Sequence, residues 1–250
     1  MGISTRAALF LGLSLASGVP AIAGCPHSGP DAVSIQRTAD GRLTTGDGVE
    51  IVLAGIALPE TPESAGSLPE TLPTEALRAT PVSPPDRYGR IAALVHDDGG
   101  ELVQERLVLS GAAIARPGAV EEACAVHLLA SEAEARSQGR GIWRGAGTAL
   151  QATDVTSLSA RSGLYALVQG RVVSVGYGSR MVFIDFGRNF RADFTIMVPE
   201  GPLSRLREAG FPLDFLVGRD VRVRGVIEES GGPAIRLTHP LALELLDGTE

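Results

Sequence analysis

The alternation of apolar and polar residues, and the place where it stops, most restricts the folds that this chain can adopt. Apolar residues recur at every second position through residues 33–56 and again from residue 163 to near the C-terminal end. That period is typical of strands with one buried face. Between these stretches, residues 101–110 and 121–138 repeat their apolar side chains every three or four positions, which predicts two amphipathic helices. The sequence therefore predicts an α+β protein, mainly β with some α, with two β-rich units.

The second β-rich stretch has the element order expected of an OB-type barrel. Five strands with one helix after the third are typical of that barrel. The strands are predicted at residues 165–177, 180–187, 192–199, 220–229 and 234–240, and the helix at 201–209. Composition then divides the chain into a signal segment at 1–24, a first domain at 25–145, a small and polar linker at 146–162, and an OB-like domain at 163–250.

Residues 57–85 differ from their surroundings because they contain seven prolines. Proline removes a backbone donor and restrains the residue before it, so regular structure is disfavoured there. The segment is predicted to be a loop or partly extended chain, with at most a short helical piece at 74–79.

The N-terminus has the composition of a secretion signal. Arg6 supplies a positive charge, residues 7–19 form a short apolar run, and Ala21-Ile22-Ala23 is a small-x-small cleavage site. The run is too short to be a permanent membrane helix. The protein is therefore predicted to be exported, either periplasmic or secreted, with no transmembrane helix.

The two cysteines allow two fates for the mature N-terminus. Ile22-Ala23-Gly24-Cys25 resembles the bacterial lipobox, in which the cysteine receives a lipid anchor, and this fate predicts a membrane-anchored lipoprotein. The alternative is a disulfide between Cys25 and Cys124, the only other cysteine, because an oxidising compartment permits it.

Several motifs in the first domain occur in the order of one nuclease family. They are "LAGIALPE" at 53–60, "DRYGRIAALVHDDGGELVQERLVLSGAAIARP" at 86–117 and "LLASEAEARSQGRGIW" at 128–143. Together they resemble the staphylococcal-nuclease-like (thermonuclease) family over residues 33–145. The resemblance implies a five-stranded OB-type barrel carrying helices, and residues 163–247 resemble the OB-type extra domain found behind such domains in some bacterial proteins.

Active members of that family cleave DNA and RNA phosphodiesters with Ca²⁺. A hard cation of this kind binds carboxylate oxygens and stabilises the negative charge that develops on the phosphate. A Glu acts on the attacking water, and two Arg side chains hold the phosphate. By resemblance, Glu60 matches the base, Arg90 matches one phosphate Arg, and Tyr88 matches a tyrosine that contacts the substrate.

Three positions depart from the family pattern. Val52 stands where the second phosphate Arg is expected, Ala57 stands where one metal-binding Asp is expected, and Arg42 occupies the place of the other. Losing one transition-state donor typically costs ~10²–10³ in rate, and here two metal carboxylates are replaced as well. No cofactor is therefore expected, whereas Ca²⁺ is implied if the chain is an active nuclease.

The retained residues also have ordinary structural explanations. Glu60 in a turn fits a solvated side chain, and Arg90 either holds a phosphate or pairs with Glu60 across the old site. The histidines at 27, 96, 127 and 239 show no ligand spacing, so no zinc site is predicted.

Charge restricts the choice of partner. The chain has a net charge of −7, and removal of residues 1–24 takes away one Arg and no acidic residue, which makes it −8. Such a charge disfavours a general polyanion-binding surface. A local patch in the second domain is the best nucleic-acid candidate, and the alternative is that its aromatic residues are barrel core. The patch comprises Arg171, Arg180, Arg188 and Arg191 with Tyr177, Phe183, Phe186 and Phe190.

The sequence leaves three functions open, and with them whether the chain is an enzyme. The favoured one is an exported two-domain protein with a degenerate nuclease site, acting by binding or as a structural component at the cell envelope. The others are an active metal-dependent nuclease and a single-stranded nucleic-acid-binding protein. A shared fold cannot choose among them, because function depends on the site.

Overall fold

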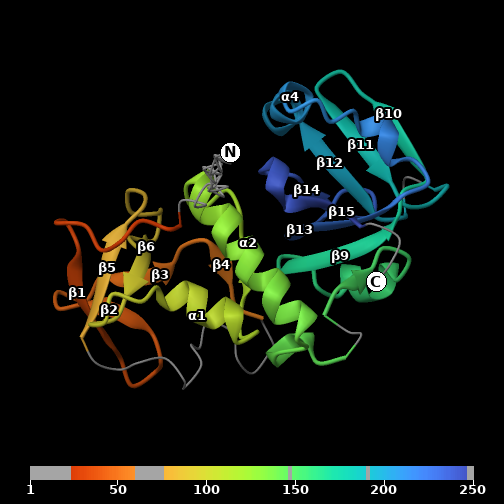
Figure 1. Cartoon of the computed structure of the whole chain (residues 1–250). Coiled ribbons are helices and arrows are strands. Elements are labelled where there is room, and N and C mark those ends of the chain that lie inside the picture. Colours follow the sequence, from red (N-terminus) through yellow and green to blue (C-terminus); the bar gives the residue numbers. More distant parts are fainter. Residues whose placement is uncertain (1–23, 60–75, 146–147, 190–191, 247–250) are drawn as a thin grey trace, which may run out of the picture.

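A computed structural model describes residues 24–59, 76–145, 148–189 and 192–246 (Figure 1). The first β-rich unit is a closed barrel with the strand order β1-β2-β3-β6-β5. Its neighbours are antiparallel except for the parallel pair β3–β6. The closed barrel predicted for this part of the chain is therefore confirmed. Its strands are β1 (Val33–Arg37), β2 (Leu43–Thr45), β3 (Glu50–Leu53), β5 (Leu77–Pro81) and β6 (Ile91–His96).

The short helical piece predicted at 74–79 is wrong for the residues of that range that are described. Strand β5 begins at Leu77, where Leu77 and Ala79 are buried and Arg78 between them is exposed. β1 and β6 pair with β5 on its two sides, so its backbone groups find partners in ladders rather than in a helix. Tertiary pairing has outweighed local preference.

Two helices lie against the barrel, close to their predicted ranges. They are α1 (Val103–Leu109) and α2 (Glu122–Ser137), and a 3-10 turn, η1 (Gly141–Trp143), follows them. Gln104 of α1 is fully buried; its side chain accepts a hydrogen bond from the Val95 N–H at 3.1 Å and donates one to the Ala93 carbonyl at 2.8 Å. This amide fixes α1 to β6.

Two glycines allow η1 to return to the end of α1. A Cβ atom on Gly111 would lie 2.2 Å from the Arg140 carbonyl oxygen, and one on Gly141 would lie 2.3 Å from the Gly111 carbonyl oxygen. Both residues have positive φ, so the contact and the backbone conformation each require glycine. A small separate sheet pairs β4 (Ile56–Ala57) with β7 (Ile114–Ala115) beside this contact.

The second unit is one sheet with the order β10-β11-β12-β14-β13-β9-β8, and β15 also pairs with β13. The sheet ends at β10 and β8, so closure into a second barrel stays a prediction. The predicted helix at 201–209 is present as α4 (Glu200–Glu208). The strands are β8 (Leu150–Gln151), β9 (Tyr165–Arg171), β10 (Ser174–Tyr177), β11 (Met181–Asp185), β12 (Thr195–Pro199), β13 (Asp220–Glu229), β14 (Pro233–Arg236) and β15 (Leu243–Leu246).

The predicted linker at 146–162 differs from the structure where it is described. Residues 148–162 contain β8, which pairs with β9, and a short helix, α3 (Val155–Ser159), whose N-terminus Asp154 caps. Leu158 is fully buried in the core of the second unit. The small and polar composition of this segment gave no sign of its regular structure. One buried leucine and one paired strand are enough to attach it to the second unit.

The two units meet along α2, which lies between the barrel and strands β9 and β13 (Figure 1). Arg224 of β13 makes a two-pronged ion pair with Glu132 of α2, at 2.9 and 3.0 Å, and both side chains are almost completely buried. Arg224 also donates to the Ala115 carbonyl at 3.1 Å and contacts Glu244. An apolar cluster of Ile114, Ala135, Trp143 and Leu167 continues this contact. None of the helices in the described ranges has the length and apolar composition needed to cross a membrane.

Candidate functional site

Arg42 stands at the start of β2, in a cluster of its own ion pairs. Its guanidinium lies 2.8 Å from the Asp40 carboxylate and 3.5 Å from the Glu50 carboxylate. A hydrogen bond from Thr38 lowers the pKa of Asp40 more than desolvation raises it, and the nearby Arg42 charge lowers it further. A guanidinium is therefore already the counter-ion of the two carboxylates closest to this position.

Val52 lies beside Arg42 on the next strand. The antiparallel register pairs Leu43 with Ile51, and one further step places Arg42 opposite Val52. The Val52 side chain, at the position predicted to have lost a phosphate-binding Arg, is apolar and 39% exposed. The guanidinium opposite it is that of Arg42, just before β2, and this guanidinium is paired with the Asp40 and Glu50 carboxylates.

The loop before β6 holds the retained residues of the "DRYGR" motif. The Asp86 carboxylate accepts hydrogen bonds from the backbone N–H groups of Tyr88 at 2.8 Å and Arg90 at 3.0 Å. It also accepts one from the Arg90 guanidinium at 2.9 Å. Desolvation raises the pKa of Asp86, but these hydrogen bonds outweigh it and leave the pKa below its ordinary value. The partner of Arg90 is Asp86, and Glu60, the partner considered from the sequence, lies outside the described residues.

Tyr88 projects from this loop with 67% of its surface exposed. The Arg87 guanidinium carbon lies 4.8 Å from the ring centroid, and that of Arg90 lies 5.2 Å from it. Such distances are those of cation–π contacts. The loop therefore presents an accessible aromatic ring with two cations beside it.

Ala57 lies apart from these residues. It belongs to β4, which pairs with β7 outside the barrel, and it packs against the apolar cluster that joins the two units. Leu167 of that cluster comes from β9 of the second unit. An Asp at this position would place a carboxylate against an apolar contact, which is costly without a partner.

The structure thus brings together only part of the predicted site. Parallel pairing of Ile51 with Ile91 places Arg90 beside Glu50 one step earlier, whereas Arg42 is opposite Val52, two residues further along β3. These side chains therefore belong to three adjacent strands of the barrel but not to one strand end. Ala57 is on a separate sheet. Within the described ranges, no three His, Cys, Asp or Glu side chains are grouped to hold a metal ion. Arg42 and Ala57, which the resemblance places at the two metal positions, offer no carboxylate oxygen of the kind that Ca²⁺ needs.

Cys25 and Cys124 form a disulfide in the structure, which joins the N-terminal segment to α2. A chain in this state has no free Cys25 sulfur for lipid attachment. Of the four histidines, His27, His96 and His127 line one cavity beside the disulfide, although their spacing in the sequence gave no sign of it. His127 pairs with Glu105 at 2.9 Å, and His96 is almost completely buried.

The aromatic and arginine patch predicted in the second domain separates into core and surface. Phe186 belongs to the core, Phe183 is half-buried, and Tyr177 is 58% exposed. Arg171 forms an ion pair with Asp220 at 2.8 Å. Phe190 and Arg191 lie outside the described residues. Of the three described aromatic residues of the patch, only Phe186 agrees with the core alternative, and Tyr177 stays on the surface.

Sequence reasoning missed Glu132 and Arg224, the buried pair between the units. Glu132 lies in a run of alternating Glu and Ala that predicts a solvated helix face. The one available signal was Arg224, an Arg within the apolar strand 220–229, where every second residue is expected to be buried.

Comparison with known proteins agrees with the fold. Residues 50–145 match the family model described as "Staphylococcal nuclease homologue". No curated protein matches the chain. The matched residues include three strands of the closed barrel, together with α1 and α2. The chain therefore carries a domain of the staphylococcal nuclease homologue family, folded as a closed five-stranded OB-type barrel.

Proposed function

We propose that this protein is exported and that its nuclease-like domain does not hydrolyse phosphodiesters with a metal ion. Its role is binding or structural, at the cell envelope. The observation that carries the proposal is Arg42, which stands at a metal-carboxylate position and is paired with Asp40 and Glu50.

The charge at this position opposes a divalent cation. Exchange of a carboxylate for a guanidinium removes a ligand and adds a positive charge next to the vacated position. Asp40 and Glu50 do not compensate, because the Arg42 guanidinium already lies within 3.5 Å of both. A metal ion would have to displace that guanidinium before it could bind an oxygen of either carboxylate.

Ala57 supports the same conclusion independently. The position expected to hold the second metal carboxylate packs against the cluster that joins the two units. A small apolar side chain suits that contact, so the replacement of Asp is consistent with attachment of the second unit rather than with chemistry.

The loop that contains Asp86, Tyr88 and Arg90 has a structural explanation that does not require catalysis. Asp86 holds Arg90 and the backbone of Tyr88 within a self-contained turn, and such a turn persists without a substrate. A retained motif and a lost activity are therefore compatible in this domain.

A nuclease assay tests the proposal. Purified mature protein is incubated with Ca²⁺, Mg²⁺ or Mn²⁺ on denatured DNA and on RNA, beside a Glu60→Ala variant and metal-free reactions. We expect no metal-dependent cleavage above the level of the variant. Cleavage that depends on the metal and disappears in Glu60→Ala would instead establish the active nuclease alternative.

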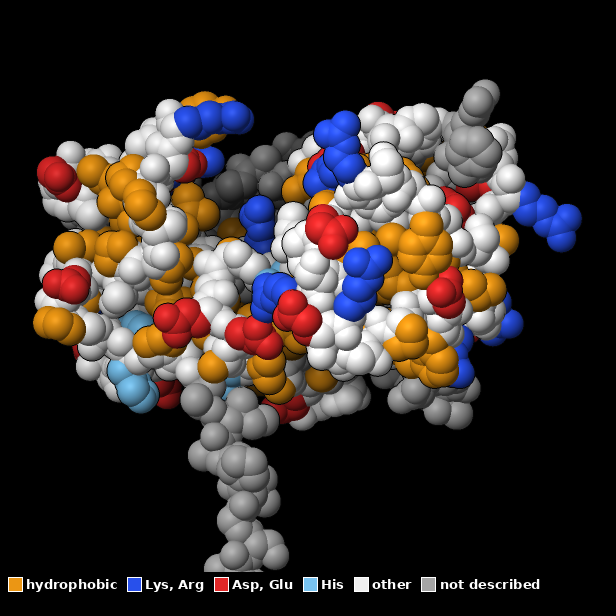
Figure 2. Space-filling view, turned by 90° about the horizontal axis from the view of Figure 1, so that it is seen from above, with side chains coloured by type: hydrophobic (Ala, Val, Ile, Leu, Met, Phe, Trp, Pro, Cys, Tyr) orange, Lys and Arg blue, Asp and Glu red, His pale blue; other side chains and the backbone are white. Residues whose placement is uncertain are grey.

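Single-stranded nucleic-acid binding without cleavage is the second candidate, and the exposed Tyr88 ring between Arg87 and Arg90 favours it. Bases stack on exposed aromatic rings, and cations hold the phosphates. Figure 2 shows basic and acidic side chains interspersed over one face of the molecule, which agrees with a local rather than a general polyanion surface. A salt titration of oligonucleotide binding, with Tyr88→Ala against Tyr177→Ala, distinguishes this loop from the second unit. Absence of binding at low salt would exclude both.

Mass spectrometry of the mature protein tests export and the N-terminus. We expect a chain that begins at residue 25 and is two hydrogen masses lighter than its reduced form, because Cys25 and Cys124 are joined. A diacylglyceryl adduct on Cys25 would establish the lipoprotein alternative and exclude this disulfide.

A further inference from the structure

A cavity of about 410 Å³ lies between the two units, next to β4. Ile114 and Ile142 of the nuclease-like domain form one wall, and Leu150, Leu164 and Leu167 of the second unit form the other. Volumes of this size and positions between domains are typical of small-molecule sites. The cavity exists only in the two-unit protein, because neither unit has both walls.

The walls are held in a fixed relation by the contacts around them. Leu167 and Ile114 belong to the apolar cluster between the units, and the buried Arg224–Glu132 pair lies beside it, with Arg224 bonded to the Ala115 carbonyl next to Ile114. The cavity is therefore a preformed feature rather than a gap that domain motion would close.

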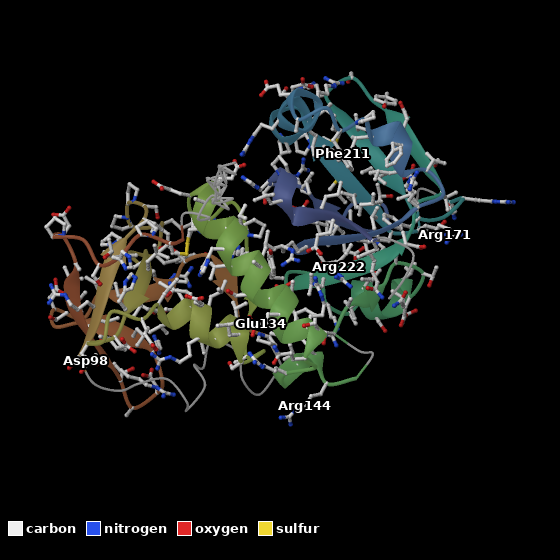
Figure 3. All side chains as sticks on the ribbon, in the orientation of Figure 1. Asp98, Glu134, Arg144, Arg171, Phe211 and Arg222 are labelled. Carbon is white, nitrogen blue, oxygen red and sulfur yellow. A yellow bond between two sulfur atoms is a disulfide. The ribbon has the colours of Figure 1, made fainter. Side chains whose placement is uncertain are left out.

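The charged groups at this cavity are cationic. Arg144 and Arg161 line it, and neither guanidinium has an ion pair or a hydrogen bond with any residue of the described ranges. Arg144 extends outward beside η1, at the rim (Figure 3). Most other arginines of the described chain are paired, such as Arg42, Arg171 and Arg205.

A third unpaired guanidinium lies close by. Arg116 lies over the ring of Tyr165, 5.3 Å from the centroid, and Tyr165 also lines the cavity. Burial raises the pKa of Tyr165 to about 12, so the ring stays neutral and adds no negative charge. The Thr148 hydroxyl already donates to the Ile142 carbonyl. Among the residues that the structure describes, no carboxylate thus pairs with the positive charge at the mouth of this cavity.

We propose that this cavity binds a small amphipathic anion, whose apolar body fills the space between the units and whose acidic head lies between Arg144 and Arg161. An apolar interior selects against a purely inorganic anion, and the unpaired guanidiniums select against neutral and cationic amphiphiles. The head is a carboxylate or a phosphate monoester, since a guanidinium binds both in the same two-pronged geometry. The inference does not depend on the proposed loss of nuclease activity.

Four probes of the full mature protein test the chemistry: decanoate, decyl phosphate, decanol and decyltrimethylammonium, each below its micelle concentration. Binding is measured by isothermal calorimetry and by the rise in melting temperature. We expect decanoate or decyl phosphate, or both, to bind at least tenfold more tightly than decanol, and decyltrimethylammonium not to bind. Equal binding of decanol, or of the cationic probe, would overturn the proposal, as would failure of both anions to bind.

Variants at the rim locate the site. The double variant that carries Arg144→Gln and Arg161→Gln is expected to bind the anion about tenfold or more weakly. The reason is that a charge-assisted contact is lost. Arg188→Gln is the matched control, since Arg188 is also exposed and unpaired but lies on the far part of the second unit. Arg161→Glu with Arg144→Glu should reverse the preference toward decyltrimethylammonium. An equal loss in Arg188→Gln, or an unchanged preference in the charge-reversed protein, would contradict the assignment.

Discussion

At the scale of single residues, the main finding at the predicted site is which carboxylates its two arginines bind. Arg90 keeps the place of a phosphate-binding residue, yet its guanidinium is bonded to Asp86 of its own loop. Arg42 brings a cation to a place where carboxylates are expected and pairs with Asp40 and Glu50. The residue types of a nuclease site are partly present, but their charges are satisfied among themselves.

Glu132 offers a direct test of the buried pair. Glu132→Ala leaves Arg224 buried with one carboxylate partner fewer, and loss of one member of a buried pair typically costs ~3–5 kcal/mol. Glu134→Ala is the control, because Glu134 is two residues away on the same helix and about half exposed. Its effect on the free energy of unfolding, measured in urea, should be within ~0.5 kcal/mol. Equal effects of the two substitutions would contradict a structural role for the pair.

His96 should make stability depend on pH. Burial lowers its pKa, and the charge of His27 lowers it further, against the opposing effects of a hydrogen bond with Pro26 and of Asp97. Because the folded pKa lies below the unfolded value of 6.5, the unfolded chain binds more protons, and stability falls as the pH drops from above 6.5 through the folded pKa. His96→Asn should flatten this dependence between about pH 8 and pH 5 in urea unfolding. An unchanged slope would show that His96 does not contribute.

At the scale of elements, the helices and barrel are joined by few but specific contacts. α1 is attached to β6 through the Gln104 amide, and η1 approaches the end of α1 only because Gly111 and Gly141 lack side chains. The short β4–β7 sheet lies outside the barrel and packs against Leu167 of the second unit through Ile114 and Ala57. These contacts place Ala57 next to the second unit.

Gln104→Leu tests the attachment of α1. The substitution keeps an apolar volume but leaves the Val95 N–H and the Ala93 carbonyl without their side-chain partner in the core. The Ala93 carbonyl keeps the Ala54 N–H as a partner, so the Val95 N–H is the group that loses its partner, and the expected loss in unfolding free energy is ~1–3 kcal/mol. Gln138→Leu, at the exposed end of α2, should change it by less than ~0.5 kcal/mol. A neutral Gln104→Leu protein would mean that the helix is held by apolar packing alone.

At the scale of the whole molecule, the two units behave as one body. The buried Arg224–Glu132 pair, the cluster around Trp143 and the surface pair Arg205–Glu122 all cross between them. A shared interface of this kind couples the unfolding of its two sides. We therefore expect a single calorimetric transition for the mature protein, with equal calorimetric and van't Hoff enthalpies.

A variant that breaks the buried pair tests the same coupling between the two units. Glu132→Ala should split the calorimetric trace into two peaks or broaden it, because the pair that couples the units is broken. Two resolved peaks in the unsubstituted protein would instead show that the units unfold independently and that the interface contributes little.

The family, the barrel and the approximate helix ranges followed from the sequence, because they depend on local periodicity and short motifs. The departure of Val52, Ala57 and Arg42 from the pattern that the resemblance implies stays a prediction from the sequence. β5 was missed because its strand state depends on β1 and β6, which lie far away in the chain. α3 and β8 were missed because polar composition outweighed one buried leucine.

The sequence by itself determined that residues 50–145 form a nuclease-like domain, and it predicted that Arg42, Val52 and Ala57 depart from the family pattern. Only the tertiary structure decided what the replacements face: Arg42 its own carboxylates, Ala57 an apolar contact with a second unit, Arg90 an Asp of its own loop. The physical reason is that residue type depends on the chain alone. Burial, charge pairing and the cavity between the units depend on which distant segments meet.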